Sequence, residues 1–374
     1  MKVLIVAMRS IHTIRWVSQL ENSGHEVHWF DILNGGRINE WPWVTQHTDW
    51  RYKFGDFKGR FFLKKYLPVI HRLFENDVEK EFEKLLQIIK PDVVQSIVMY
   101  NCCVPIFSVM QRNKHIKWIY SAWGNDLFYY RNVPAYRKDI LKVLPKIDYM
   151  FADCKRDITI AKELGFQGKV LGVFPGGGGY KINEYAKYSK PLLDRDIILV
   201  KGYEQRFGRA LNVIEALVNI KTDLTNYRIV VFGADDEFHS RYSSLEGTEF
   251  IDVKSRLKHK DVLKLLGESI VYIGNSISDG MPNTLLEAII MGAFPIQSNP
   301  GGASAEIIEN GKNGLLIEDC ENIELIATLI KTAIGNQALL QSAMSFNEEL
   351  RPTLDFDFVG KQVVEKYNWV EKNL

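Results

Sequence analysis

Short apolar runs alternate with amphipathic stretches along most of the chain. Each run is bounded by glycine or polar residues, which is the pattern of strands buried on both faces of a parallel sheet. Strands are expected at 2–7, 26–30, 92–98, 117–121, 149–152, 169–173, 197–200, 227–232, 249–253, 270–274, 294–297 and 314–317. Helical periodicity is clearest at 13–23, 209–218, 260–266 and 283–291. This alternation predicts an α/β protein with helices on both faces of its sheets.

The pattern is interrupted once, by four glycines after Pro175 and the polar stretch 180–196. At 374 residues the chain is long enough for two cores. We therefore predict two Rossmann-like, doubly wound parallel-sheet domains, at 1–178 and 179–355. Open sheets of this kind bind ligands beyond the carboxyl ends of their strands, so a central cleft between two facing sheets would suit a reaction with two substrates.

Composition and missing motifs exclude several classes of protein. The loop after the first strand, MRSIHT, lacks the G-x-G-x-x-G of nicotinamide enzymes. A net charge of +1 argues against a dedicated nucleic-acid binder. The four cysteines have no zinc-type spacing and are expected to be free thiols, as in a reducing compartment. The N-terminal apolar run is too short for a signal peptide, and no long window is free of polar residues, so we expect a cytoplasmic protein.

The segment SDGMPNTLLEA, at 278–288, carries the clearest chemical pattern. Gly280 permits a tight turn, and Pro282 suits the first turn of the helix expected at 283–291. Because this helix follows a buried strand, its unpaired N–H groups and positive dipole end form an anion site at the sheet edge. Asp279 can reach a sugar hydroxyl from the loop, and Glu287 can accept hydrogen bonds from a ribose diol.

A cationic loop, KGYEQRFGR at 201–209, directly follows another expected strand. Together with the helix start described above, it makes the sequence resemble glycosyltransferase family 4. The family pattern is an acid, Gly-x-Pro, a glutamate eight positions after the acid, and a later Gly-x-Pro. Here Asp279, Gly280, Pro282 and Glu287 match it, and Gly292-Ala293-Phe294-Pro295 is a loosened last element. The resemblance covers about 197–320 and includes the blocks at 300–302, 306–308 and 310–316. It departs at Asp279, where the family usually has a glutamate, longer by about 1.5 Å.

The resemblance implies a GT-B fold, with an acceptor-binding domain at 1–178, a donor-binding domain at 179–355 and a C-terminal helix, 356–374, that packs back on the first domain. It also implies that Lys201 and Arg206 bind a donor diphosphate, although the family has the two residue types in the opposite order. Fixed cations there stabilise a leaving group that gains charge in the transition state. The other residues assigned to donor binding are Glu287, Gly280, Met281, Pro282, Asn283, Thr284, Leu285, Arg209, Gly202 and Gly233.

In the first domain, SAWGNDL at 121–127 is similar to a cleft-edge block of the same family. Many relatives have a histidine where Trp123 stands. Trp123 and Asn125 are candidates for the acceptor side, and Asp126 either holds an acceptor hydroxyl or caps the following helix. His12, on the loop after the first strand, either faces the cleft or is structural. With Asp126, the candidate catalytic residues are Asp279, Lys201 and Arg206.

Two further charged segments permit alternative interpretations. The triplet Asp235-Asp236-Glu237 is similar to a metal-binding acidic motif but fits a solvated acidic turn better, so no metal and no cofactor are expected. The segment 50–72, WRYKFGDFKGRFFLKKYLPVIHR, interleaves basic and aromatic residues. It either grips the anionic inner face of a cell membrane and a lipid-linked acceptor, or packs in the core with its charges directed to solvent.

The resemblance implies metal-independent transfer of a hexose-like unit, with retention, from a nucleoside diphosphate sugar such as a UDP-sugar. The acceptor would be a hydroxyl of a glycan or lipid-linked glycan in bacterial-type surface polysaccharide synthesis. A nucleotide-sugar epimerase or a phosphorylase of the same fold would need acid–base histidines or a lysine-anchored cofactor, which the sequence does not signal. A glycosyltransferase-like binding protein without activity is the alternative from another class, motivated by Asp279 and by the absent histidine.

Overall fold

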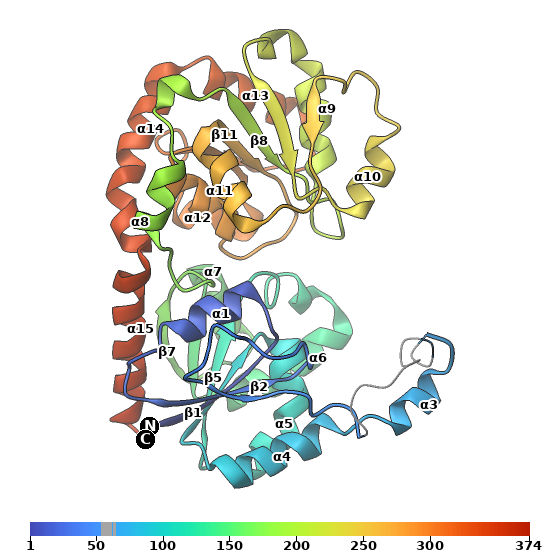
Figure 1. The fold of residues 1–374 in the computed structure, drawn as a ribbon, viewed down its shortest axis with the longest axis vertical. Helices are drawn as coiled ribbons and strands as arrows, with labels where there is room; N and C mark the ends of the chain where they lie inside the picture. Colours follow the sequence, from blue (N-terminus) through green and yellow to red (C-terminus); the bar gives the residue numbers. More distant parts are fainter. Residues whose placement is uncertain (54–61, 63–64) are drawn as a thin grey trace. The chain divides into compact units, whose positions relative to one another are not determined.

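The computed structural model describes residues 1–53, 62 and 65–374. Within these residues the strands form two parallel sheets, with strand orders β3-β2-β1-β4-β5-β6-β7 and β10-β9-β8-β11-β12-β13 (Figure 1). Each sheet belongs to a separate compact unit. The first unit comprises 1–153, 157–178 and 360–374, and the second comprises 154–156 and 179–359. Besides the short stretch 154–156, the main chain changes unit after Gly178 and again after Val359.

Helices lie on both faces of the first sheet, as the doubly wound pattern predicts (Figure 1). The elements of this unit are β1 (Lys2–Ala7), α1 (Ile11–Ser18), β2 (Glu26–Asp31), β3 (Thr45–His47), α3 (Pro68–Leu73), α4 (Val78–Ile89), β4 (Val93–Ile97), a π-helix (Met99–Cys103), α5 (Phe107–Arg112), β5 (Lys117–Ala122), α6 (Pro134–Val143), β6 (Tyr149–Ala152), α7 (Lys155–Glu163) and β7 (Lys169–Val173). The short edge strand β3 and the π-helix are additions to the elements expected from the sequence, because neither carries a clear hydrophobic period.

The second unit repeats this plan around its own sheet. Its elements are α8 (Ile182–Tyr185), β8 (Ile197–Lys201), α9 (Ala210–Asn219), β9 (Arg228–Phe232), α10 (Asp236–Tyr242), β10 (Ile251–Val253), α11 (His259–Glu268), β11 (Ser269–Gly274), α12 (Asn283–Met291), β12 (Phe294–Ser298), β13 (Leu315–Ile317), α13 (Ile323–Ile334) and α14 (Gln337–Leu350). In each sheet the strand order reverses at a switch point, between β1 and β4 in the first and between β8 and β11 in the second. Loops that leave the two strands of a switch point diverge, which opens a crevice at their carboxyl ends.

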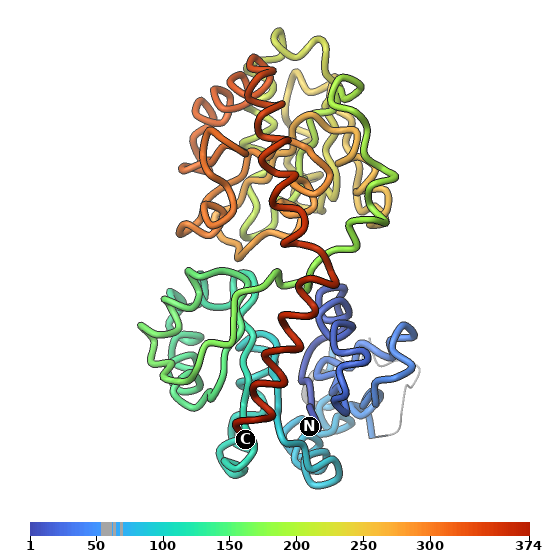
Figure 2. The backbone as a smooth tube through the Cα atoms, turned by 90° about the vertical axis from the view of Figure 1, so that its left-hand side faces the viewer, coloured from blue at the N-terminus to red at the C-terminus, as the bar shows by residue number. Residues whose placement is uncertain are grey.

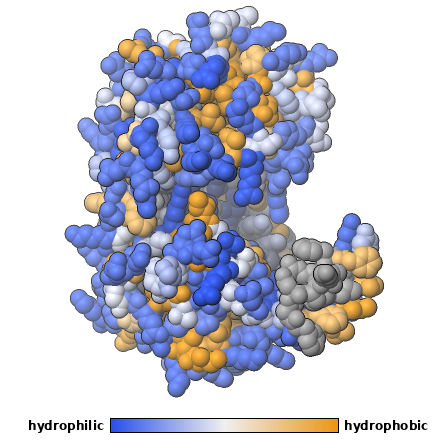
Figure 3. All heavy atoms as spheres, in the orientation of Figure 1, coloured by the Kyte–Doolittle hydropathy of each residue, from blue (hydrophilic) through white to orange (hydrophobic). Residues whose placement is uncertain are grey.

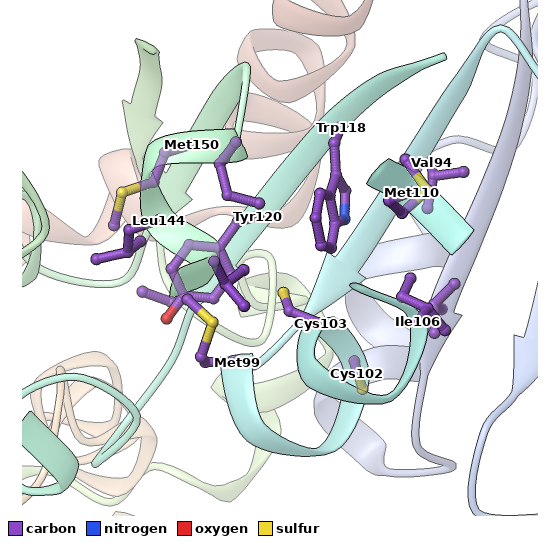
Figure 4. Packing of buried hydrophobic residues seen from close by; sticks show 14 of the residues in the cluster. Val94, Met99, Cys102, Cys103, Ile106, Met110, Trp118, Tyr120, Leu144 and Met150 are labelled. Atoms are coloured by element: carbon purple, nitrogen blue, oxygen red, sulfur yellow. The ribbon is translucent and has the colours of Figure 1, made fainter. Parts of the chain in front are cut away.

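Large aromatic and sulfur-containing side chains fill one core of the first unit (Figure 4). Trp118 points from β5 toward Cys103 and Tyr120 points toward Met99 (Figure 4), and the polar atom of each has a buried partner. The Trp118 indole donates to Ser96 Oγ at 3.0 Å, and the Tyr120 hydroxyl donates to Asp126 at 2.5 Å. Burying each such side chain contributes about 1.5–3 kcal/mol, and the hydrogen bonds remove the cost of burying the polar atoms.

The C-terminal helix expected at 356–374 is α15 (Phe356–Glu371), drawn red in Figure 2. From residue 360 onward it belongs to the first unit. Its buried Tyr367 accepts a hydrogen bond from the Trp16 indole at 3.2 Å and donates to Gln95. Glu371 pairs with the amino terminus, so the two ends of the chain lie close together (Figure 2).

None of the four cysteines forms a disulfide. Burial raises the pKa of the Cys102 and Cys103 thiols well above their usual range, which keeps both thiols protonated and unreactive. Among the residues that the structure describes, no single helix is both long and apolar enough to cross a membrane. The pair 323–334 and 337–354 together meets the length and composition requirement, with a bend of 85° between them.

Candidate functional site

The cationic loop and the segment before α12 meet at the carboxyl edge of the second sheet. Backbone hydrogen bonds join them: Arg209 N donates to Asn275 O at 3.0 Å, and Ile277 N donates to Phe207 O at 2.8 Å. Both loops leave the strands of the switch point, β8 and β11. The two segments that carry the sequence motifs, about 70 residues apart, therefore form one surface.

Glycines allow these loops to approach one another closely. A Cβ on Gly208 would lie 1.9 Å from the Tyr203 carbonyl oxygen, and one on Gly202 would lie 2.9 Å from Ala234 Cα. Gly233 has a φ of +68°, a conformation that side chains disfavour. Gly202 and Gly233, both assigned to donor binding, are therefore also required by the local structure, because they allow the ends of β8 and β9 to lie close together.

The three cations of the loop have different surroundings. Lys201 is half-buried and Arg206 is exposed, each with its charge near an aromatic ring, of Tyr203 and Phe207 respectively. Arg209 instead forms an ion pair with Glu321, which lowers the pKa of that carboxyl. All three cations therefore lie on the loop that follows β8, and Arg209 is held by Glu321.

Glu204, within the cationic loop, is a buried structural acid that the sequence analysis did not single out. Its carboxylate accepts a hydrogen bond from Leu211 N at 3.0 Å and pairs with Arg241 at 2.6 Å. Burial raises its pKa, and the backbone and arginine contacts oppose that rise. Because Glu204 occupies the N-terminal end of α9, that helix end is filled by the protein's own carboxylate.

Asp235 is not the solvated acidic turn that the sequence suggested. Its Oδ2 accepts hydrogen bonds from Glu204 N at 2.9 Å and Gln205 N at 3.1 Å, while its Oδ1 accepts from Phe238 N at 2.9 Å. Asp235 therefore caps α10 and at the same time holds the cationic loop. The other two acids of the triplet are exposed. Among the described residues, no grouping of metal-binding side chains includes a residue assigned to the donor site.

The start of α12 is open to a ligand in a way that the start of α9 is not. Its N-cap residue, Pro282, makes no side-chain capping hydrogen bond. The Asn283 side chain is held by the Tyr180 hydroxyl at 2.6 Å, and Asp279 Oδ1 accepts from Gly280 N at 2.8 Å. Backbone N–H groups at such a helix start attract anions.

Two of the residues assigned to donor binding from this helix are core residues. The side chains of Met281 and Leu285 are buried in the hydrophobic cluster beneath the helix. Their side chains therefore position the helix, and only their main-chain atoms are suited to contact a ligand at its N-terminus.

Glu287 has two neighbours that the sequence analysis missed. Its buried carboxylate is 2.7 Å from His259 Nε2, at the start of α11. The buried Tyr272 hydroxyl lies near Thr284 and near both Asp279 and Glu287. Burial first, and then these two carboxylates, raise the pKa of Tyr272, so it stays a protonated donor. A tyrosine in an otherwise apolar strand was the signal available in the sequence.

In the first unit, a pocket of about 300 Å³ lies at the switch point between β1 and β4. Trp123, Asn125 and Asp126 all line it, together with Met8 and three tyrosines. His12 is not among its lining residues and lies in the first turn of α1 rather than on a loop. The block 121–127 therefore faces one pocket, and His12 does not join it.

Asp126 is buried beneath that pocket and is already hydrogen-bonded. Its Oδ2 accepts from Met99 N at 2.6 Å and from the Tyr120 hydroxyl at 2.5 Å. Burial raises its pKa to about 7, and these hydrogen bonds limit the rise. Asp126 caps the π-helix at the end of β4 rather than the helix that follows it in the chain.

Comparison with known protein families gives a match within the second unit. Residues 186–351 match the family described as Glycosyl transferases group 1. The match includes the cationic loop and α12. No curated protein sequence matches the chain significantly.

Solved structures resemble the chain over nearly its whole length. Sucrose-phosphate synthase from Thermosynechococcus elongatus superposes with a TM-score of 0.76 at 12% identity, covering 100% of both chains. A glycosyltransferase from Rickettsia africae has a TM-score of 0.73 at 16% identity, covering 100% of this chain and 99% of the other. Anabaena HepE, solved with UDP and glucose, has a TM-score of 0.71 at 14% identity, covering 98% and 99%. At these identities the likeness shows the fold, which is GT-B.

Proposed function

We propose that this chain, which has the GT-B fold and matches the group 1 glycosyltransferase family within its second unit, is a glycosyltransferase. It transfers a hexose-like unit from a UDP-sugar to a hydroxyl of a glycan. The observation that carries the proposal is the union, at one switch point, of Lys201 and Arg206 with the uncapped start of α12. Together they offer fixed positive charge to a diphosphate.

Each group of the donor has a partner in this arrangement. The diphosphate binds Lys201, Arg206 and the N–H groups of α12, while Glu287 accepts hydrogen bonds from the ribose. Asp279, fixed by its contact with Gly280, reaches a hydroxyl of the transferred sugar. As the bond from the sugar to the diphosphate breaks, charge grows on the leaving oxygens, and preorganised cations stabilise it without reorganisation.

We further propose that transfer retains the configuration of the anomeric carbon, as the family resemblance implies. No side chain is assigned as a covalent nucleophile. The incoming hydroxyl therefore attacks on the face that the diphosphate leaves, and its proton passes to a leaving phosphate oxygen. The acceptor proposed is a glycan or lipid-linked glycan of a cell-surface polysaccharide, modified on the cytoplasmic side.

A donor panel tests the proposed function. UDP, ADP and GDP are compared by thermal shift, and release of UDP is measured with a set of UDP-sugars. A ligand that binds only the native state raises its stability by about 2.7 kcal/mol at a hundred times its Kd, so UDP should raise the melting temperature clearly. No shift with any nucleoside diphosphate, and no release of UDP, would show that the chain is a protein without the proposed activity.

Excess chelator is expected to leave activity unchanged. Lys201, Arg206 and the helix start supply the positive charge, and Asp235 is used by backbone N–H groups. The check is the initial rate of UDP release with EDTA, and again after adding Mg²⁺ or Mn²⁺. A loss of activity that Mn²⁺ restores would assign a metal to the site.

Contact with an anionic membrane is proposed for the segment 50–72, of which residues 54–61 and 63–64 lie outside the described residues. Large apolar side chains are exposed on and beside α3, where Figure 3 shows hydrophobic residues gathered. They are Phe62, Tyr66, Leu67, Ile70 and Leu73, with exposed fractions of 61, 58, 42, 43 and 68%. Exposed Lys65 and Arg72 accompany them. Aromatic and basic side chains together bind the headgroup region of anionic bilayers.

Co-sedimentation with vesicles tests this contact. Binding to vesicles containing phosphatidylserine is expected at low salt and should weaken as salt rises, because screening shortens the reach of the charges. A variant with Phe62→Ser, Lys65→Ser, Tyr66→Ser and Arg72→Ser should bind much less, since each basic residue contributes about 1 kcal/mol. Equal sedimentation of wild type and variant at all salt concentrations would instead favour a soluble acceptor.

A further inference from the structure

Two neighbouring pockets of the first unit share the same two residues, Tyr100 and Asn101. The first is the pocket of about 300 Å³ that Asp126 underlies. The second has a volume of about 410 Å³ and is lined by residues that include Leu33, Trp50 and Val104. Both volumes fall in the range of ligand pockets, about 300–1,000 Å³. Tyr100 is 44% exposed although it is a large aromatic residue.

The backbone that presents Tyr100 is strained. Val98 has a φ of +67° and a ψ of 145°, a conformation that β-branched residues very rarely adopt and that costs on the order of 1–3 kcal/mol. The π-helix Met99–Cys103 follows directly. Strained backbone conformations and π-helices both occur frequently at functional sites, where the conformation contributes to function despite its free-energy cost.

Buried contacts hold this backbone in place. Val98 N donates to Ser121 O at 3.0 Å, and Met99 N donates to Asp126 Oδ2 at 2.6 Å. Cys102 and Cys103, at the other end of the π-helix, are completely buried in the core shown in Figure 4. The rigid turn therefore directs Tyr100 and Asn101 to the surface between the two pockets.

The first pocket has the chemistry of a sugar site. The rings of Tyr100 and Tyr136 have centroids 4.2 Å apart, and those of Tyr136 and Tyr130 are 4.5 Å apart and stacked. These three rings come from the π-helix, α6 and the turn before it. Aromatic rings pack against the C–H faces of a pyranose, while the amides of Asn101 and Asn125 bond its hydroxyls.

The second pocket mixes apolar and polar walls in the same way. Trp50 is fixed by its indole hydrogen bond to Asp31 O at 2.8 Å, and Asn76 donates to Trp50 O at 2.6 Å. Arg51 and Glu75 form an ion pair at its edge. Amide, charged and aromatic groups fixed around a cavity can bond the hydroxyls and cover the faces of a second polar ring, whereas a hydrocarbon chain would make no use of the polar groups.

We propose that the acceptor is a glycan of at least two sugar units, which binds with one unit in each pocket and with Tyr100 and Asn101 at the linkage between them. This inference rests on the proposed function and specifies its acceptor. A monosaccharide would fill one pocket and leave the other hydrated.

The test uses the full chain, saturated with UDP, on an array of mono-, di- and trisaccharides. Disaccharides or longer glycans should bind at least about tenfold more tightly than the monosaccharides they contain, a difference of about 1.4 kcal/mol. Tyr100→Ala should lower the affinity for the disaccharide at least about tenfold, and Tyr100→Phe should retain most of that affinity. Phe250→Ala, which removes an aromatic side chain of similar exposure (37%) from the other unit, should change nothing.

A second variant tests the second pocket separately. Leu33 is 46% exposed and lines only the larger of the two pockets, so Leu33→Trp should fill that pocket without disturbing the core. Disaccharide affinity should fall toward that of the monosaccharide, whose own binding should not change. Equal affinities for mono- and disaccharides, or wild-type binding by both Tyr100→Ala and Leu33→Trp, would overturn the inference. The absence of any bound glycan while UDP still raises the melting temperature would also overturn it, but would leave donor binding standing. A failure of UDP itself to bind would refute the proposed function.

Discussion

Replacing Lys201 and Arg206 together by alanine is expected to lower the affinity for UDP by about a hundredfold or more. Each charge-assisted contact with the diphosphate contributes about 1.5–3 kcal/mol, and 1.4 kcal/mol corresponds to a factor of ten. The fold should survive, because Arg206 is exposed and Lys201 only half-buried. Isothermal titration calorimetry with UDP measures the loss directly.

The matched control for this variant is Lys221→Ala with Lys264→Ala. Both lysines are exposed in the same unit and have no assigned role, so the net charge changes equally while the site remains intact. The control should bind UDP as the wild type does. If the two double variants lose affinity equally, the effect is one of overall charge, and if neither does, the diphosphate binds elsewhere.

Asp126→Asn is expected to become more stable relative to the wild type as pH rises from 5 to 8. The pKa of Asp126 is raised from 3.8 to about 7 in the folded protein, mainly by burial. The folded state therefore binds the proton more tightly than the unfolded state does. The stability that this provides is complete below about pH 4 and is lost progressively as pH rises to about 7.

Asparagine keeps the geometry of the neutral acid at every pH. Both hydrogen bonds to Asp126, from Met99 N and from the Tyr120 hydroxyl, reach the same oxygen, so one amide carbonyl can accept both. At about 1.4 kcal/mol for each pKa unit, the difference in free energy of unfolding should change by roughly 2–3 kcal/mol between pH 5 and pH 8. Urea unfolding of both proteins at intervals of one pH unit measures it.

The control for this experiment is Asp236→Asn, at an exposed carboxyl. Its difference from the wild type should stay nearly constant with pH. A constant difference for Asp126→Asn as well would mean that Asp126 titrates in the folded state as it does in the unfolded chain.

In the second unit, the starts of α9 and α12 show that an amino-acid pattern can identify a possible anion site but does not show what occupies it. Both α9 and α12 follow buried strands of the same switch point. At α9 the protein's own Glu204 takes the position, whereas Pro282, the N-cap residue of α12, makes no side-chain capping hydrogen bond. Only the second is open to a phosphate. The two helix starts differ because the loop that contains Glu204 folds back and places its carboxylate at the start of α9. The residues next to Glu204 in the sequence do not reveal this position.

The sequence by itself determined the fold class, the strands of both sheets except β3, and the loops to which donor binding is assigned in the proposed function. These depend on local signals: apolar runs specify buried parallel strands, and connection rules place the loops that follow them at one sheet edge. The tertiary structure alone decided that Asp126 and Asp235 accept hydrogen bonds from the backbone of distant segments. It also brought Tyr272 and His259 to Glu287, and three tyrosines from separate segments into one row. Burial and hydrogen-bond partners set the role of a polar side chain, and both are supplied by residues distant along the chain.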